Sequence, residues 1–133
     1  MKRVTGIGGV FFRSRDPKAS LEWYRKHLGI DSAEWGGYAF QWRQKEQAEE
    51  IGYTVWSAFP NDTKHFAPSQ ETFMVNYRVD DLDALVAELK SEGVDVVGDV
   101  EQHENGKFAW ILDPEGRKVE LWEPVPSKDD PYL

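Results

Sequence analysis

Residues 106–124, GKFAWILDPEGRKVELWEP, indicate two strands joined by a tight turn. Proline fixes the first backbone angle of such a turn, the preceding aspartate caps the turn amides, and glycine accepts a positive φ where the chain reverses. In the second strand side chains alternate between faces, so Glu120 and Trp122 share one face while Val119 and Leu121 share the other. A carboxylate beside an indole in mid-strand marks this face as a candidate functional surface.

The order of elements before this hairpin indicates an internal repeat. In each half an apolar strand candidate is followed by a helix that an aspartate caps and a glycine ends. Asp16 caps the first helix, and Asp80 or Asp81 caps the second. The interval from Asp16 to Asp80 equals the interval from Gly29 to Gly93. A constant offset of this length is typical of two copies of one supersecondary unit.

Three further strands are predicted after each helix, which makes each half a βαβββ unit. The predicted strands are residues 4–12, 30–35, 38–43 and 51–59 in the first half, and 72–79, 94–100, 108–112 and 118–123 in the second. The first unit covers residues 4–59, a linker or flap 60–71, the second unit 72–124, and a polar, loosely held tail 125–133. A unit of about 60 residues cannot bury a stable core alone. We therefore predict an α+β fold in which the units pack together as one structural domain, or against a second chain.

The composition narrows the classes of partner. The chain has 16 basic and 24 acidic residues, a net charge of −8, which disfavours nucleic acid because its phosphates would be repelled. It has no cysteine and therefore no disulfide, thiol nucleophile or thiolate metal site. The first apolar run stops at Arg13, too short for a signal peptide, and no later stretch is long enough to span a bilayer. We expect a cytoplasmic protein with a small-molecule partner and no nucleic-acid or membrane partner.

Two of the six tryptophans occupy matching positions in the repeat. Trp122 follows Trp56 at almost the same interval as that between the helix caps, which places Thr54 at the position of Glu120. The two indoles would either line a pocket, where they stack a planar ligand or hold a cation, or fill the space between the units. Glu120 would be either a pocket carboxylate, acting as a base or pairing with a cationic ligand, or a structural residue bonded to arginine or backbone.

Other polar and aromatic residues are weaker candidates for the same surface. Strand alternation and the repeat add Asn76, Trp110 and Phe40 as ligand-binding candidates, with a solvent-facing edge as the alternative for Asn76. His65 and His103 lie in predicted loops. Either could swing over a pocket as acid or base, and the alternative is an ordinary surface histidine.

Several motifs give the chain a resemblance to the vicinal oxygen chelate superfamily, which includes glyoxalase I, bleomycin-resistance proteins and extradiol dioxygenases. The motifs are Arg15-Asp16-Pro17, Trp23-Tyr24, Leu28-Gly29, Val79-Asp80-Asp81-Leu82, Glu92-Gly93-Val94, Leu112-Asp113-Pro114-Glu115-Gly116 and Val119-Glu120-Leu121-Trp122-Glu123. The resemblance covers about residues 4–124. It implies paired βαβββ modules that curl into a half-barrel of mixed sheet around a cavity, and members are commonly homodimers.

The resemblance also implies where a metal ion would bind. Metal-dependent members hold a divalent ion on the first and last strands of each half. In this chain Glu120 matches the last-strand ligand of the second half, whereas the other positions fall at Thr54, Gly9 and Met74. One carboxylate does not make a metal site, because three or four nitrogen or oxygen ligands are needed. We expect no cofactor, and a function of metal-independent binding of a small aromatic or cationic molecule in the cavity between the modules.

The alternative is a glyoxalase-type metal-dependent lyase or isomerase, or a dioxygenase, with Glu120 in the active site. In that case a divalent metal ion would be recruited with help from His65, His103 or a partner chain, and an imidazole nitrogen should lie close to Glu120. A third possibility is a dimer with a regulatory role.

Overall fold

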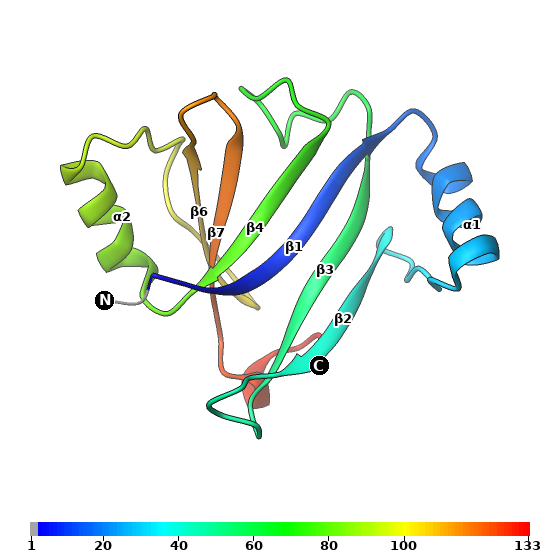
Figure 1. Cartoon of the computed structure of the whole chain (residues 1–133), viewed down its shortest axis with the longest axis horizontal. Coiled ribbons are helices and arrows are strands. Elements are labelled where there is room, and N and C mark those ends of the chain that lie inside the picture. Colours follow the sequence, from blue (N-terminus) through cyan, green and yellow to red (C-terminus); the bar gives the residue numbers. More distant parts are fainter. Residues whose placement is uncertain (1–2) are drawn as a thin grey trace.

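The computed structural model describes residues 3–133, in which seven strands form one mixed sheet and two α-helices lie outside it (Figure 1). The strand order is β2-β3-β1-β4-β7-β6-β5. In chain order the elements are β1 (Val4–Ser14), α1 (Pro17–Leu28), β2 (Gly37–Arg43), β3 (Ile51–Pro60), β4 (Phe73–Val79), α2 (Leu82–Ser91), β5 (Glu101–His103), β6 (Gly106–Leu112), β7 (Lys118–Pro124) and the short 3₁₀ turn η1 (Ser127–Asp129). The sheet is curled, with one concave and one convex face (Figure 1).

The two halves of the sheet have the same arrangement and meet at β1 and β4. β1 and β4 pair antiparallel at the centre, and each also pairs in parallel with the last strand of its own half, β3 and β7 respectively. An antiparallel partner, β2 or β6, then follows outward in each half. This arrangement confirms the predicted α+β fold built from two related halves.

Residues 30–35 do not form the strand predicted for the first half. The amide of Ala33 donates to the carbonyl of Gly37 at 2.8 Å, and the amide of Gly36 donates to the carbonyl of Ala33 at 3.0 Å. These bonds close a local turn, and Gly36 has a φ of 97°, which a strand does not tolerate. Within residues 3–133, the first half therefore has three strands and the second has four.

The strand predicted at residues 94–100 is also replaced by a shorter contact. Val96 forms an isolated bridge with Ile111, and the amide of Val97 donates to the carbonyl of Trp110 at 2.8 Å. Gly98, with a φ of 72°, then turns the chain, so that the regular strand starts only at Glu101.

Aspartates begin both helices, as the sequence predicts. Asp16 Oδ1 accepts a hydrogen bond from the amide of Ala19 at 3.1 Å, and Asp81, rather than Asp80, accepts from the amide of Ala84 at 3.1 Å. Gly29 ends α1 with a φ of 71°. No helix within residues 3–133 is long and apolar enough to cross a membrane.

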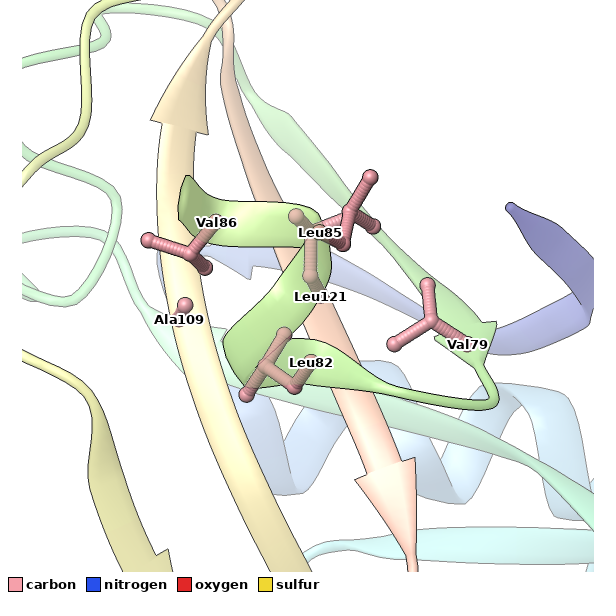
Figure 2. Packing of buried hydrophobic residues seen from close by; sticks show 6 residues of the cluster. All are labelled: Val79, Leu82, Leu85, Val86, Ala109 and Leu121. Atoms are coloured by element: carbon pink, nitrogen blue, oxygen red, sulfur yellow. The ribbon is translucent and has the colours of Figure 1, made fainter. Parts of the chain in front are cut away.

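The convex face of the second half carries the aliphatic core (Figure 2). Leu82, Leu85 and Val86 of α2 pack on Ala109 of β6 and Leu121 of β7, and all five are buried. The i, i+3, i+4 spacing in α2 and the two-residue alternation in β7 bring these side chains to one interface. On the first half, α1 packs in the same way on β1 and β3.

The concave face holds a second, largely aromatic cluster. Phe11, Met74 and Trp110 point into the curl of the sheet and are joined by Phe66 from the segment 61–72. Phe66 is fully buried. The segment predicted as a linker or flap between the two halves is therefore packed into the concave face through Phe66.

The polar tail after β7 is also packed, contrary to the expectation of a loosely held end. Asp130 is buried, and its Oδ2 accepts a hydrogen bond from the Tyr53 hydroxyl of β3 at 2.8 Å. The amide of Ser127 donates to Glu50 Oε2 at 3.3 Å. The tail thus crosses from the second half back to the first.

Candidate functional site

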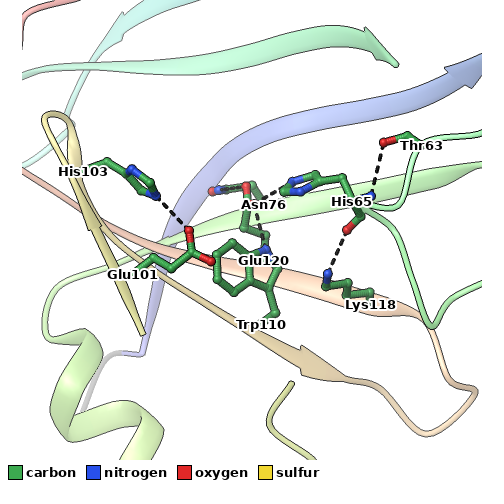
Figure 3. Close-up of polar contacts among 8 residues, drawn as sticks. All are labelled: Thr63, His65, Asn76, Glu101, His103, Trp110, Lys118 and Glu120. Carbon is green, nitrogen blue, oxygen red and sulfur yellow. Dashed lines mark hydrogen bonds and ion pairs between the residues drawn. The ribbon is translucent and has the colours of Figure 1, made fainter. Parts of the chain in front are cut away.

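Glu120 of β7 lies on the concave face at the centre of a hydrogen-bond network (Figure 3). Its side chain is buried, and Oε1 accepts from Trp110 Nε1 at 2.9 Å. Oε2 accepts from Asn76 Nδ2 at 2.6 Å, and His65 Nε2 lies 3.2 Å from Oε1. Three nitrogen-bearing side chains from three separate segments therefore converge on one carboxylate.

The strand register explains two of these three contacts. Asn76 is directly opposite Glu120 in the β4–β7 pair, and Trp110 is directly opposite Glu120 in the β6–β7 pair. Residues directly opposite each other in neighbouring strands point to the same face, so the three side chains must meet. The structure brings together the predicted candidates Glu120, Asn76 and Trp110.

His65 enters the site from the segment between the two halves. Its ring is stacked on Phe59 with centroids 5.3 Å apart and an interplanar angle of 4°. Lys118 Nζ donates to the His65 carbonyl at 2.8 Å, which ties this segment to β7. Because a carboxylate only accepts hydrogen bonds, Nε2 carries the hydrogen toward Glu120, and Nδ1 of a neutral ring keeps a lone pair. The His65 side chain is about one-third exposed, whereas Glu120 lies behind it.

A pocket of about 530 Å³ opens beside this network. Its lining includes His65, Trp110 and Lys118, together with the acidic residues Asp99 and Glu101. Lys118 Nζ lies 5.5 Å from the centre of the Trp110 ring. Partial burial lowers the pKa of Lys118, and the charge of the nearby Glu120 opposes that shift. The pocket thus combines an indole, an imidazole and an amine at one wall.

Glycines in β1 allow the network to lie close to the backbone. A Cβ atom on Gly8 would lie 2.1 Å from Asn76 Oδ1 and 2.9 Å from the Trp122 ring. The β1–β4 register shifts between Ile7 and Gly9, so β1 is irregular at the same point where its backbone lies close to Asn76. Asn76 Oδ1 is buried against Gly8 and has no hydrogen-bond partner among the described residues.

Trp122 shares the concave face with Glu120, as predicted, but its ring is enclosed. Its ring is stacked on Phe108 with centroids 5.7 Å apart and packs edge-on against Tyr53 at 5.2 Å. Its Nε1 donates to the Asn105 carbonyl at 2.9 Å, and the Arg78 guanidinium lies 4.8 Å from the ring centre. Only 1% of Trp122 is exposed, so this indole is packing in the structure and not an open pocket wall.

The prediction that Trp56 and Thr54 share the face of Trp122 and Glu120 is wrong. Trp56 packs beneath α1, and its ring centroid lies 4.9 Å from that of Tyr24 and 5.3 Å from that of Phe12. On β3 the concave face is occupied instead by Tyr53 and Val55, because neighbouring residues of a strand alternate. The predicted offset therefore matches residues that lie on opposite faces of the sheet, and a slip of a single residue is enough to reverse the face.

Thr54 and Phe40 also lie away from Glu120. The Thr54 hydroxyl donates to the Ile7 carbonyl at 2.7 Å and accepts from Trp42 Nε1 at 3.0 Å, so it links β3 to β1 and β2. Phe40 is directly opposite Thr54 in the β2–β3 pair and is 42% exposed. The structure therefore does not bring these two candidates to Glu120. His103 is also absent from the network, because its Nε2 contacts the exposed Glu101 at 3.0 Å.

Two residues of this region were not singled out from the sequence. Lys118 lies two residues before Glu120 on the same strand, so the alternation that selected Trp122 also predicts it. Phe59, the residue on which His65 stacks, had no such signal, because its contact depends on the path of the segment that follows β3.

The donor set at Glu120 does not fit a divalent metal ion. Within residues 3–133, no group of three or more histidine, cysteine, aspartate or glutamate side chains is arranged to hold one. Glu120 and His65 are two such side chains, and the first-strand positions that the resemblance implies, Gly9 and Met74, carry no ligand for such an ion. The carboxylate oxygens already face N–H groups of Trp110 and Asn76, where a metal site would present further ligands.

Comparison with solved structures places the fold among known proteins. Methylmalonyl-CoA epimerase from Mycobacterium tuberculosis is 26% identical over 95% of this chain and 92% of that chain, with a TM-score of 0.61. A variant of Streptomyces coelicolor methylmalonyl-CoA epimerase in complex with 2-nitronate-propionyl-CoA is 17% identical over 92% of this chain and 99% of that chain, with a TM-score of 0.66. An NAD-dependent benzaldehyde dehydrogenase from Legionella pneumophila is 12% identical over 88% and 98%, with a TM-score of 0.57. At such low identity the last two likenesses concern the fold alone.

Sequence comparison identifies the family. No curated protein matches the chain by sequence. The Glyoxalase/Bleomycin resistance protein/Dioxygenase superfamily matches residues 6–121, which includes both halves of the repeat and the strand that carries Glu120. The chain belongs to the Glyoxalase/Bleomycin resistance protein/Dioxygenase superfamily.

Proposed function

We propose that this chain binds a small, planar, cationic aromatic molecule without a metal ion, in the pocket lined by His65, Trp110 and Lys118. The observation that carries the proposal is the environment of Glu120. The carboxylate is buried, and two of its three partners, Trp110 and Asn76, are neutral donors. A buried negative charge that lacks a full counter-charge is stabilised by a cation placed near it.

The charges around the pocket support the choice of a cation. Within residues 3–133, the basic side chain within ion-pair distance of Glu120 is His65, which carries a charge only when protonated. The residues that line the pocket carry equal numbers of basic and acidic side chains, Lys64 and Lys118 against Asp99 and Glu101. The buried carboxylate of Glu120 lies just outside this lining and adds one negative charge, which acts on Lys118 at the pocket wall.

The rings around the pocket support the choice of a planar ligand. The Trp110 indole lines the pocket, and the stacked pair of His65 and Phe59 lies beside it. Rings of this kind hold a flat ligand by stacking, and an indole face attracts a cation. The pocket volume of about 530 Å³ lies within the usual range of small-molecule sites, about 300–1,000 Å³.

Isothermal titration calorimetry on chelator-treated protein tests this function with two probes of nearly the same shape, N-methylquinolinium and neutral quinoline. We expect the cation to bind more tightly than quinoline, and Glu120→Gln to abolish that preference. His103→Ala is the matched control, because His103 also contacts a glutamate but lies outside the network. Equal affinity for both probes, or binding only after a divalent metal ion is added, would contradict the proposal.

A second candidate is metal-free proton transfer at a carbon next to a carbonyl. The observation that favours it is the 3.2 Å contact between His65 Nε2 and Glu120 Oε1 at the wall of an open pocket. Glu120 orients the ring, so Nδ1 can take a proton from the substrate carbon and return it, while Lys118 stabilises the enolate oxygen. The epimerases with a similar fold suggest methylmalonyl-CoA as the first substrate to test.

Deuterium uptake in D₂O measured by mass spectrometry tests this second candidate. We expect methylmalonyl-CoA to gain one deuterium faster with the protein than without it, and His65→Gln to remove the acceleration while His103→Gln retains it. A rate equal to that of the protein-free solution would rule the candidate out for this substrate.

A further inference from the structure

A second cavity, of about 380 Å³, lies on the concave side of the first half. We call it the aromatic pocket, and it is lined by Trp35, Ala39, Tyr53, Val55, Asn105 and Tyr132. These residues are all different from those that line the pocket beside Glu120. The two pockets therefore have separate walls and can be changed separately.

Small residues keep the floor of the aromatic pocket open. Ala39 and Val55 are directly opposite each other in the β2–β3 pair and present short side chains. Gly37 precedes them, and a Cβ atom there would lie 2.5 Å from the Trp35 ring. The missing side chain at Gly37 lets the Trp35 indole lie along β2 at the edge of the cavity.

Two large aromatic side chains at this cavity remain unusually exposed. Trp35 is 54% exposed and Tyr132 is 59% exposed, although both line a concave, mainly apolar space. A ligand placed against both rings would remove their apolar surface from water, which is favourable in proportion to the area covered.

Two polar groups at the aromatic pocket are already paired within the protein. The Tyr53 hydroxyl donates to Asp130 Oδ2 at 2.8 Å, and burial raises the pKa of Tyr53, so the phenol stays neutral. The Asn105 carbonyl accepts from Trp122 Nε1 and from the amide of Val125. The lining residues are all uncharged, so the pocket offers stacking surface and selects against ionic ligands.

The tail supplies one wall and is fixed in place to do so. Asp130 is buried against Tyr53, and its Oδ1 accepts from the amide of Tyr132 at 2.9 Å. One aspartate therefore anchors the tail to β3 and orients the residue that carries the exposed ring. The cavity requires the contact between the tail and the first half.

We propose that the aromatic pocket is a second binding site, which takes a neutral bicyclic aromatic molecule against Trp35 and Tyr132. This site goes beyond the function proposed above, because it does not use Glu120 or His65. It also takes a different class of ligand, a neutral ring in place of a cationic one.

Titration with indole, followed by two-dimensional ¹H–¹⁵N NMR, tests the proposal on the whole chain. We expect indole to shift the backbone amides of Ala39, Val55 and Tyr132. Tyr132→Ala and Trp35→Ala should each weaken indole binding about tenfold, the loss expected when one stacking ring is removed. Both side chains are more than half exposed, so the variants should retain the fold, which their amide spectra report directly.

The controls separate this site from the pocket beside Glu120. Trp23→Ala removes an indole of the same 54% exposure from α1 and should leave indole binding unchanged. Glu120→Gln should also leave it unchanged, so loss of the cation preference there and loss of indole binding here are independent results. The proposal is overturned if indole shifts no amide of the aromatic pocket, or if Tyr132→Ala and Trp35→Ala bind indole as tightly as the unmodified protein.

Discussion

Asn76 and Glu120 are directly opposite each other on β4 and β7, and the amide nitrogen of the first donates to Oε2 of the second at 2.6 Å. This contact joins the first strand of the second half to its last strand. It also fixes the orientation of the carboxylate on which both candidate functions depend.

Asn76→Asp should convert this contact into a repulsion between two buried carboxylates of nearly unchanged shape. We expect a loss of about 3 kcal/mol in the free energy of unfolding at pH 7, measured by urea denaturation. Asn61→Asp, at an exposed loop position, is the control, and an equal effect of both substitutions would contradict the network.

Gly8→Ala should disrupt the site through the backbone of β1. The new Cβ would lie 2.1 Å from Asn76 Oδ1, so the asparagine or the strand must move. We expect destabilisation of about 1–3 kcal/mol, the usual range for overpacking, in a thermal or urea melt. Gly6→Ala is the matched control on the same strand, because its nearest atom is 3.6 Å away, and it should change stability by less than about 0.5 kcal/mol. Equal stability of the two variants would contradict the close contact between Gly8 and Asn76.

Tyr53→Phe should reveal how strongly the tail is attached and how that attachment depends on pH. Burial, followed by the contact with Asp130, raises the pKa of Tyr53 in the folded protein above its ordinary value near 10. The stabilisation is therefore fully present below pH 10 and is lost as the pH rises through the folded-state value. We expect the free energy of unfolding, measured by urea denaturation, to be about 1 kcal/mol higher for the unmodified protein than for Tyr53→Phe at pH 7, and the difference to be smaller above pH 10. A stability difference that stays constant from pH 7 to pH 11 would contradict the pKa shift.

Lys118→Met should loosen the segment that carries His65. Lys118 Nζ donates to the His65 carbonyl at 2.8 Å, and a hydrogen bond from a charged donor contributes about 1.5–3 kcal/mol. We expect amide hydrogen exchange at Ala67 and Ser69 to accelerate about tenfold or more. Lys107→Met removes a comparable 2.8 Å bond to Asp83 elsewhere and should leave these amides unchanged. Unchanged exchange in Lys118→Met would show that packing of Phe66 alone holds the segment.

Features that depend on neighbouring residues could be predicted from the sequence. The turn at Asp113 is one: its Oδ1 accepts from the amides of Glu115 and Arg117, and Gly116 has the positive φ that the turn needs. The helix caps and the alternation that places Glu120 and Trp122 on one face are local in the same way. The homodimer implied by the family resemblance stays a prediction, which light scattering can test.

Features that depend on register between distant segments could not be predicted. The repeat matched Trp56 to Trp122, but the two side chains lie on opposite faces, because a slip of a single residue moves a side chain from the concave to the convex face. His65 was one of two loop histidines with no local distinction between them. Its contact with Glu120 spans 55 positions of the chain and depends on Phe66 and Lys118, which hold the intervening segment.

The central pairing of β1 with β4 has a consequence for the order in which the chain folds. Leu112 and Lys118 pair across the short β6–β7 turn, whereas Phe11 and Met74, opposite each other in β1 and β4, are separated by almost half of the chain. Closing the longer loop costs about 2 kcal/mol more in chain entropy. The C-terminal hairpin should therefore form early, and the union of the two halves should limit the folding rate. Substitutions between β1 and β4 will then slow refolding, while those in α2 will mainly speed unfolding.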